Sequence, residues 1–147
     1  MSEPIKIKLK LFDKTLPLPK KHSPGAACFD LYSRVEITVR PKTIEYIPLN
    51  VAIAAPEGYW VLLAPRSSLH KHGLMMANSV GIIDNDYSGD DDEYILTCYN
   101  FTDEAVTIEK GQRIAQATVL PILDIEIEQV DTLKSTARGG FGTTGKL

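Results

Sequence analysis

The chain has 147 residues, of which 44% are hydrophobic, so it can form one domain with a core of its own. Its formal net charge of -3 excludes a general nucleic-acid binder, which needs a basic surface. The first residues carry no apolar signal region, and no apolar run reaches the length of a membrane span. Cys28 and Cys98 do not form a C-x-x-C pair, which favours a reducing compartment over a disulfide framework. We therefore expect neither a membrane nor a nucleic acid as partner.

Apolar residues that alternate with polar ones predict a series of short strands along the chain. The alternation starts at residues 5–11, where every second residue is a lysine. Pro48 interrupts a later alternation and is better suited to an edge strand or a bulge. Residues 59–64 are continuously apolar, which is typical of a strand buried on both faces. The expected strands are 5–11, 35–39, 47–53, 59–64, 94–101, 105–108, 114–120 and 125–128.

One short helix is expected in residues 65–73, where Ser67 or Ser68 could cap its start and Gly73 could end it. From residue 134 onward the chain has almost nothing to bury except Phe141. We therefore expect a β domain over residues 1–133 and a flexible arm over 134–147. Many short strands without a helical period predict an all-β fold, an antiparallel jelly-roll-like sandwich or barrel.

The stretch from Val80 to Tyr94 reads as a β-hairpin with a widened, acidic end. It contains Asp84 and Tyr87, and a hairpin mouth can hold a carboxylate and a ring at fixed separation beside free backbone groups. Such an arrangement suits a nucleobase with its sugar. An ordinary solvent-exposed turn is the alternative, since Asp, Asn and Gly are common turn residues.

Five stretches resemble, in order, the five motifs of the trimeric deoxyuridine triphosphate nucleotidohydrolases (dUTPases). The resemblance implies hydrolysis of dUTP to dUMP and pyrophosphate, which lowers dUTP and supplies dUMP for thymidylate synthesis. It also implies a homotrimer whose sites are shared between subunits, in the cytoplasm, or in a host's cytoplasm or nucleus if the protein is viral. The stretches are residues 26–31, 65–69, 81–87, 111–116 and 138–145.

The resemblance assigns the catalytic roles to Asp84 and Gln116. Asp84 matches the general base that deprotonates the water attacking the α-phosphorus, and a carboxylate is suited to accept that proton. Gln116 matches a residue that orients this water, although an ordinary polar strand residue is its alternative. Asp30 matches an acid that reaches Mg²⁺ through water, while the triphosphate supplies most of the metal's inner shell. No dedicated protein metal cage is therefore expected.

The resemblance also assigns the substrate contacts. Tyr87 matches a ring that packs under the deoxyribose and rejects ribonucleotides by a clash with the 2'-hydroxyl. Asn78 matches an amide near the uracil edge. Arg66 and the hydroxyls beside it suit phosphate oxygens, and a structural ion pair with a nearby acid is the alternative for Arg66. The arm matches a segment that closes over the site, with Phe141 on uracil and Arg138 on the γ-phosphate. The expected substrate-binding residues are Arg66, Ser67, Ser68, Asn78, Tyr87, Arg138, Phe141, Gly142 and Thr143.

Some residues depart from the family pattern, and two other functions remain as alternatives. Ser68 stands where a glycine is usual, and the arm is about two residues shorter than the commonest pattern. The acidic residues 90–93 are expected to form a solvated shoulder. The dCTP deaminases share the fold and an Arg-Ser-Ser-Leu motif, but they need a glutamate base where this chain has Thr97. A binding or regulatory protein on the same fold is the rival from another class.

Overall fold

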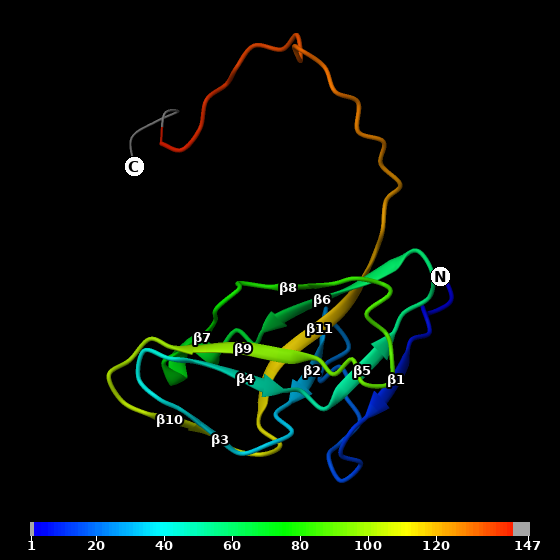
Figure 1. The fold of residues 1–147 in the computed structure, drawn as a ribbon. Helices are drawn as coiled ribbons and strands as arrows, with labels where there is room; N and C mark the ends of the chain where they lie inside the picture. The colour runs from blue at the N-terminus through cyan, green and yellow to red at the C-terminus, as the bar shows by residue number, and fades with distance from the viewer. Residues whose placement is uncertain (1, 143–147) are drawn as a thin grey trace.

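The structure is a computed structural model that describes residues 2–142 of the chain. Within this part of the chain, short antiparallel strands surround a common core and one short 3-10 helix lies between two of them (Figure 1). The elements are β1 (Lys8–Leu11), β2 (Phe29–Tyr32), β3 (Ile37–Val39), β4 (Ile44–Pro48), β5 (Val51–Ala54), β6 (Tyr59–Pro65), η1 (Leu69–His72), β7 (Leu74–Met76), β8 (Gly81–Ile83), β9 (Ile95–Asn100), β10 (Val106–Ile108) and β11 (Arg113–Pro121).

Two larger sheets supply most of the core. One has the strand order β2-β11-β6-β8 and the other has the order β4-β9-β7, while β1 pairs with β5 and β3 with β10. Leu31 and Leu63 from the first sheet and Ile47 and Leu96 from the second are at most 1% exposed and belong to one apolar cluster. The antiparallel all-β, jelly-roll-like fold is therefore confirmed.

Strand β6 is buried on alternate residues, so the expectation that both its faces are buried was wrong for this chain. Val61 and Leu63 point into the core, whereas Trp60 and Leu62 are half-buried on the outer face of the sheet. A continuous apolar run shows that both faces of a strand avoid water, but it does not show what covers each face.

The alternating stretch 47–53 forms two strands rather than one. Asn50 adopts a left-handed backbone with φ 71°, and the chain changes sheets there, from β4 to β5. An asparagine tolerates this conformation better than most residues. Pro48 ends β4, which lies at the edge of its sheet, so the edge position expected for this proline is confirmed.

The expected helix is a single 3-10 turn, and its end is set by glycine. Gly73 has φ 79° and its N–H donates to the carbonyl of His70 at 3.0 Å. A side chain at this position would also collide with the methyl group of Thr102. Ser68 precedes the turn but makes no side-chain cap hydrogen bond.

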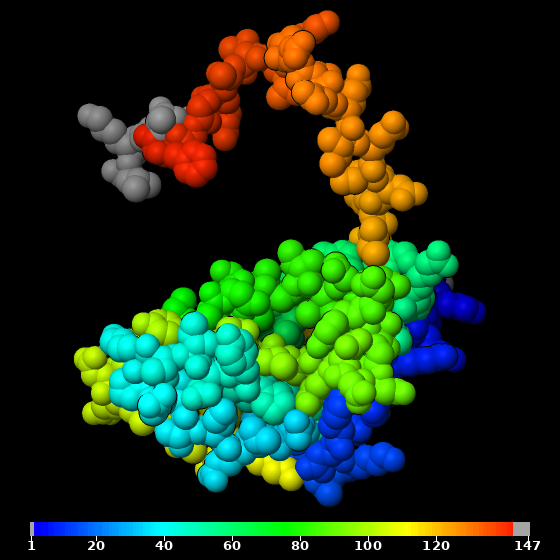
Figure 2. Space-filling model, viewed as in Figure 1, coloured from blue at the N-terminus to red at the C-terminus, as the bar shows by residue number. Residues whose placement is uncertain are grey.

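The chain leaves the folded body at the end of β11 and forms no further strand within the described residues, so the strand expected at 125–128 is absent. Ile125 and Ile127 are 78% and 88% exposed. Figure 2 shows this segment arching away from the body rather than packing on it. Among residues 2–142, no helix is long and apolar enough to cross a membrane.

Candidate active site

Asp84 and Tyr87 are the two ends of one tight turn. The N–H of Tyr87 donates to the carbonyl of Asp84 at 3.1 Å, and Asp84 follows directly on β8. The Asp84 side chain is exposed, and that of Tyr87 is 39% exposed. The turn therefore presents an accessible carboxylate and an aromatic ring from neighbouring positions.

The segment between Val80 and Tyr94 is not a hairpin, which corrects the expectation from sequence. Strand β8 pairs with β6, whereas β9 pairs with β4 and β7, so residues 84–94 cross from one sheet to the other. Asp, Asn, Ser and Gly mark the places where a chain turns, but they do not determine which strand the chain pairs with next.

The Tyr87 ring is held in place by contacts with Glu93 and Tyr94. Its hydroxyl donates to the carbonyl of Glu93 at 3.1 Å, and its centroid lies 6.3 Å from that of Tyr94. Burial raises the pKa of Tyr87, and the negative charges of Asp92 and Glu93 raise it further. The hydroxyl therefore stays protonated at neutral pH and remains a hydrogen-bond donor.

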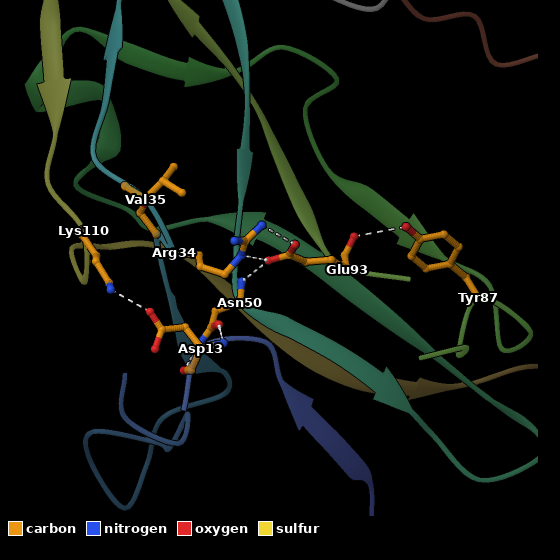
Figure 3. Close-up of polar contacts among 8 residues, drawn as sticks. Asp13, Arg34, Val35, Asn50, Tyr87, Glu93 and Lys110 are labelled. Atoms are coloured by element: carbon orange, nitrogen blue, oxygen red, sulfur yellow. Dashed lines mark hydrogen bonds and ion pairs between the residues drawn. The ribbon is translucent and has the colours of Figure 1, made fainter. Parts of the chain in front are cut away.

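Glu93 is not part of a solvated shoulder, contrary to the expectation for residues 90–93. Its side chain is 12% exposed and forms a two-pronged ion pair with Arg34, at 2.7 and 2.9 Å (Figure 3). Asp90 and Asp91 are exposed as expected. This acidic run thus combines two solvated residues with two that make structural contacts, Glu93 and Asp92, whose Oδ2 accepts from the N–H of Gly89 at 2.7 Å.

Asn85, between Asp84 and Asp86, is a residue that sequence reasoning missed. Its side-chain nitrogen donates to the carbonyl of Pro56 at 2.9 Å and to that of Tyr59 at 2.8 Å. These bonds tie the turn to the connection between β5 and β6. The sequence signals a turn residue here, but nothing in it points to this distant partner.

Asp30 forms an ion-pair centre with two arginines. Its Oδ2 lies 3.2 Å from Nε of Arg66 and 3.1 Å from Nη1 of Arg113. The structural ion pair considered for Arg66 is therefore present. Arg113 was missed as a functional candidate, although it stands in the fourth motif. A cavity of about 410 Å³ beside the pair is lined by Arg66 and Arg113 together with Ser68 and His72, a lining that favours anions.

Gln116 lies next to this centre. It faces Asp30 across the β2–β11 pairing, and its side-chain nitrogen donates to the carbonyl of Pro65 at 3.0 Å. Arg66 and Ser67 also line a second cavity, of about 320 Å³, together with Ser79. Asn78, the neighbour of Ser79, is exposed. The structure therefore gathers Asp30, Arg66 and Gln116.

The candidate residues thus form two groups in one chain: Asp84 with Tyr87, and Asp30 with Arg66 and Gln116. No hydrogen bond or ion pair joins the two groups among residues 2–142. Arg138 and Phe141 lie on the segment beyond β11, where Phe141 is fully exposed, and Gly142 follows them. Thr143 lies outside the described residues, so its expected role and those of the other arm residues stay predictions.

The part of the chain that the structure describes contains no metal centre built by protein side chains. No group of three or more His, Cys, Asp or Glu side chains that could hold a metal occurs within residues 2–142. Two guanidinium groups contact the same oxygen of Asp30, and a divalent cation is repelled by such neighbours. The donor set at Asp30 alone therefore does not fit Mg²⁺.

Comparison with known proteins gives the family of this chain. The sequence matches the dUTPase family over residues 14–145. The chain belongs to the dUTPase family. A deoxyuridine 5'-triphosphate nucleotidohydrolase of Hahella chejuensis is 40% identical over 147 residues, covering 93% of this chain and 95% of the relative. The enzyme of that name from Alcanivorax borkumensis is 36% identical over 138 residues and covers 90% of both chains.

Solved structures give the same family for the fold. A Staphylococcus bacteriophage 80alpha dUTPase mutant with dUpNHpp superposes with a TM-score of 0.82 at 26% identity, covering 95% of this chain and 98% of the other. A dUTPase from Streptococcus mutans superposes with a TM-score of 0.73 at 30% identity, covering 80% and 98%. The fold that carries the turn of Asp84 and Tyr87 and the group around Arg66 is therefore similar to that of solved dUTPases.

Proposed function

We propose that this chain is a dUTP diphosphatase, which hydrolyses dUTP to dUMP and pyrophosphate and so lowers dUTP while supplying dUMP for thymidylate synthesis. Family membership over most of the chain and the names of its relatives support this activity. The structural observation that carries it is the single turn that presents Asp84 beside Tyr87. A carboxylate and a ring at that spacing can serve water activation and sugar recognition in one place.

The proposed chemistry starts at Asp84. Its exposed carboxylate accepts a proton from the water that attacks the α-phosphorus, which is general base catalysis. Gln116 orients this water, and its bond to the carbonyl of Pro65 supports that role by restricting the amide. Departure of pyrophosphate leaves dUMP.

The proposed substrate contacts divide by chemistry. Tyr87 lies against the deoxyribose and excludes a 2'-hydroxyl, and Asn78 contributes to recognition of uracil. The phosphates are bound by Arg66 with Ser67 and Ser68, and by Arg138 of the arm. Phe141 lies on the uracil ring, and Gly142 and Thr143 complete the arm's contacts with the substrate. The two arginines at Asp30 support the phosphate assignment, because guanidinium groups bind phosphate oxygens in pairs of hydrogen bonds.

We also propose that the active form is a homotrimer in which neighbouring subunits complete each site. Three observations support it. The turn of Asp84 and the group around Arg66 share no bonded contact in one chain. The apolar side chains of residues 122–133 are exposed. The segment that leads to the arm stands clear of its own body (Figure 2). A larger assembly would cover the exposed residues and bring the two groups together.

Magnesium belongs to the proposal through the substrate rather than through a protein cage. When bound, Mg²⁺ neutralises negative charge on the phosphates, and it prefers oxygen ligands and water. The role of Asp30 as a contact through water stays a prediction. The two free cysteines support the proposed location in the cytoplasm, or in that of a host if the protein is viral.

The test is an assay of the purified protein with Mg²⁺ and, in separate reactions, dUTP, UTP and dCTP. We expect dUMP and pyrophosphate from dUTP and little turnover of the other two nucleotides. Ammonia released from dCTP would show the deaminase activity instead. A folded protein that turns over none of the three would favour a binding or regulatory role.

A further inference from the structure

The hydroxyl of Tyr87 is bonded to a backbone atom of an unusually well-anchored residue. Its acceptor, the carbonyl of Glu93, lies 3.1 Å away on the far side of the inter-sheet crossing. The residue after Glu93 is fixed by two backbone bonds: the N–H of Tyr94 donates to Val51 and its carbonyl accepts from Leu49, both at 2.8 Å. The carbonyl that holds Tyr87 therefore has little freedom.

The Glu93 side chain adds three further contacts. Its carboxylate accepts from Nε and Nη2 of Arg34 at 2.7 and 2.9 Å, and from the backbone N–H of Asn50 at 3.0 Å. The bond with Glu93 raises the pKa of Arg34, so this charge persists at every physiological pH. Planar two-pronged pairs of this kind fix geometry as well as distance.

The same cluster continues behind Glu93 (Figure 3). The Asn50 side chain accepts from the N–H of Asp13 at 2.6 Å and donates to its carbonyl at 3.0 Å. Asp13 is in turn paired with Lys110 at 2.7 Å. Residues distant in sequence thus hold the Glu93 side chain, while Tyr87 binds the Glu93 carbonyl.

We propose that Arg34 is a positioning residue for Tyr87. By holding Glu93, Arg34 fixes the carbonyl that receives the Tyr87 hydroxyl, and this bond sets how far the ring can retreat from the sugar. Rejection of a ribonucleotide by a clash requires a ring that does not move away. Arg34 therefore contributes to the choice between deoxyribose and ribose without touching substrate. This inference rests on the function proposed above.

The experiment compares kcat/KM for dUTP with kcat/KM for UTP in the full-length protein. Arg34→Lys keeps the charge but loses the two-pronged geometry, and Tyr87→Phe keeps the ring but loses the bond to Glu93. We expect each to lower the dUTP-to-UTP ratio by about three- to tenfold, the range for one lost hydrogen bond. Most of the change should be a gain of UTP turnover, because the ring can then move away from the 2'-hydroxyl.

The double variant gives the decisive comparison. If Arg34 acts through the Tyr87 hydroxyl, Arg34→Lys should lower the ratio no further once Tyr87 is Phe. Equal losses in both backgrounds would overturn the proposal, because they would show a structural effect that bypasses the hydroxyl. Should Arg34→Lys fail to fold, Tyr87→Phe still tests the premise, because it leaves the ion pair in place and a wild-type ratio would refute the inference.

A surface ion pair provides the matched control. Lys42 and Asp103 lie 3.9 Å apart with side chains 55% and 95% exposed, so Lys42→Ala should leave the ratio at the wild-type value. A change there as large as that of Arg34→Lys would contradict a specific role for Arg34. Wild-type protein without dUTP turnover would overturn the proposed function itself, whereas wild-type activity with unchanged variants would overturn this inference alone.

Discussion

Arg66 and Asp30 are joined by an ion pair of 3.2 Å, and Arg113 contacts the same carboxylate oxygen at 3.1 Å. Because one acid holds both guanidinium groups, Arg66 is already oriented before a nucleotide arrives. Less side-chain freedom then has to be lost on binding. The pair is thus compatible with phosphate binding by Arg66, since a phosphate can contact the donors that Asp30 leaves available.

Asp30→Asn should therefore weaken binding of dUTP more than it slows turnover. We expect KM to rise about tenfold, equivalent to a loss of about 1.4 kcal/mol, with a smaller change in kcat. Steady-state kinetics over a range of Mg²⁺ concentrations check this. A defect that disappears at high Mg²⁺ would instead support the contact of Asp30 with the metal through water. Asp103→Asn, on the exposed surface, is the control.

Replacing Asp84 by Asn should abolish turnover and preserve nucleotide binding. The amide has nearly the shape of the carboxylate but cannot accept the proton, and loss of a general base costs about 10²–10⁴ in rate. Calorimetry with dUTP measures binding, and pyrophosphate release measures turnover. Asp86→Asn, in the same turn, is expected to stay active. Wild-type turnover by Asp84→Asn would remove Asp84 from its role.

Asn85→Ala should lower kcat, because the turn that carries Asp84 and Tyr87 loses its bonds to Pro56 and Tyr59. A small displacement of the base suffices for a drop of about tenfold or more. Asn85→Asp should be worse, since a carboxylate cannot donate to carbonyls and its charge faces them. Melting curves should show both variants folded. Unchanged kcat in Asn85→Ala would show that the turn is fixed without this side chain.

Deleting residues 138–147 should leave a folded body with poor catalysis. Phe141 is fully exposed and makes no core contact, so little folding stability depends on it. Without the arm, water has access to the phosphates and Arg138 is missing. Circular dichroism and dUTP kinetics check the two halves of this prediction. Loss of folding on truncation would show that the arm is structural.

Ile127→Asp should weaken self-association while leaving each chain folded. The side chain is 88% exposed in the single chain, so it contributes little to the body on its own. If another subunit covers it, a charge there is costly to bury. Sedimentation equilibrium measures the assembly. Glu128→Gln, the neighbouring residue, should associate like wild type, and an unchanged Ile127→Asp assembly would exclude this segment from the interface.

Local patterns in the sequence predicted most strands, but not how they pair. The alternation at 35–39 and 105–108 became β3 and β10, which pair with each other. Residues 80–94 contained the expected turns, yet β8 joined β6 and β9 joined β4. Such pairings depend on contacts far apart in sequence, which a local pattern does not contain. The stretch 125–128 has the pattern of a strand but finds no partner edge among the described residues.

The candidate site could be predicted only in part, because some of its groupings also depend on residues far apart in sequence. Asp84 and Tyr87 are close in sequence, and their shared turn followed from residue types. The grouping of Asp30 with Arg66 and Arg113 depends on three separate segments, so it became visible only in the folded chain. The support of Glu93 by Arg34 was missed because an acidic run resembles a solvated loop.

Asn50 combines two demands that few amino acids meet together. Its left-handed backbone, with φ 71°, admits Gly, Asn and Asp most readily. Its side chain both accepts from and donates to Asp13, and of these three only asparagine has an oxygen and an NH₂ group. Almost any single substitution of Asn50 therefore loses either the backbone conformation or the paired bonds to Asp13. The surrounding loops can therefore change in sequence only if residue 50 remains an asparagine.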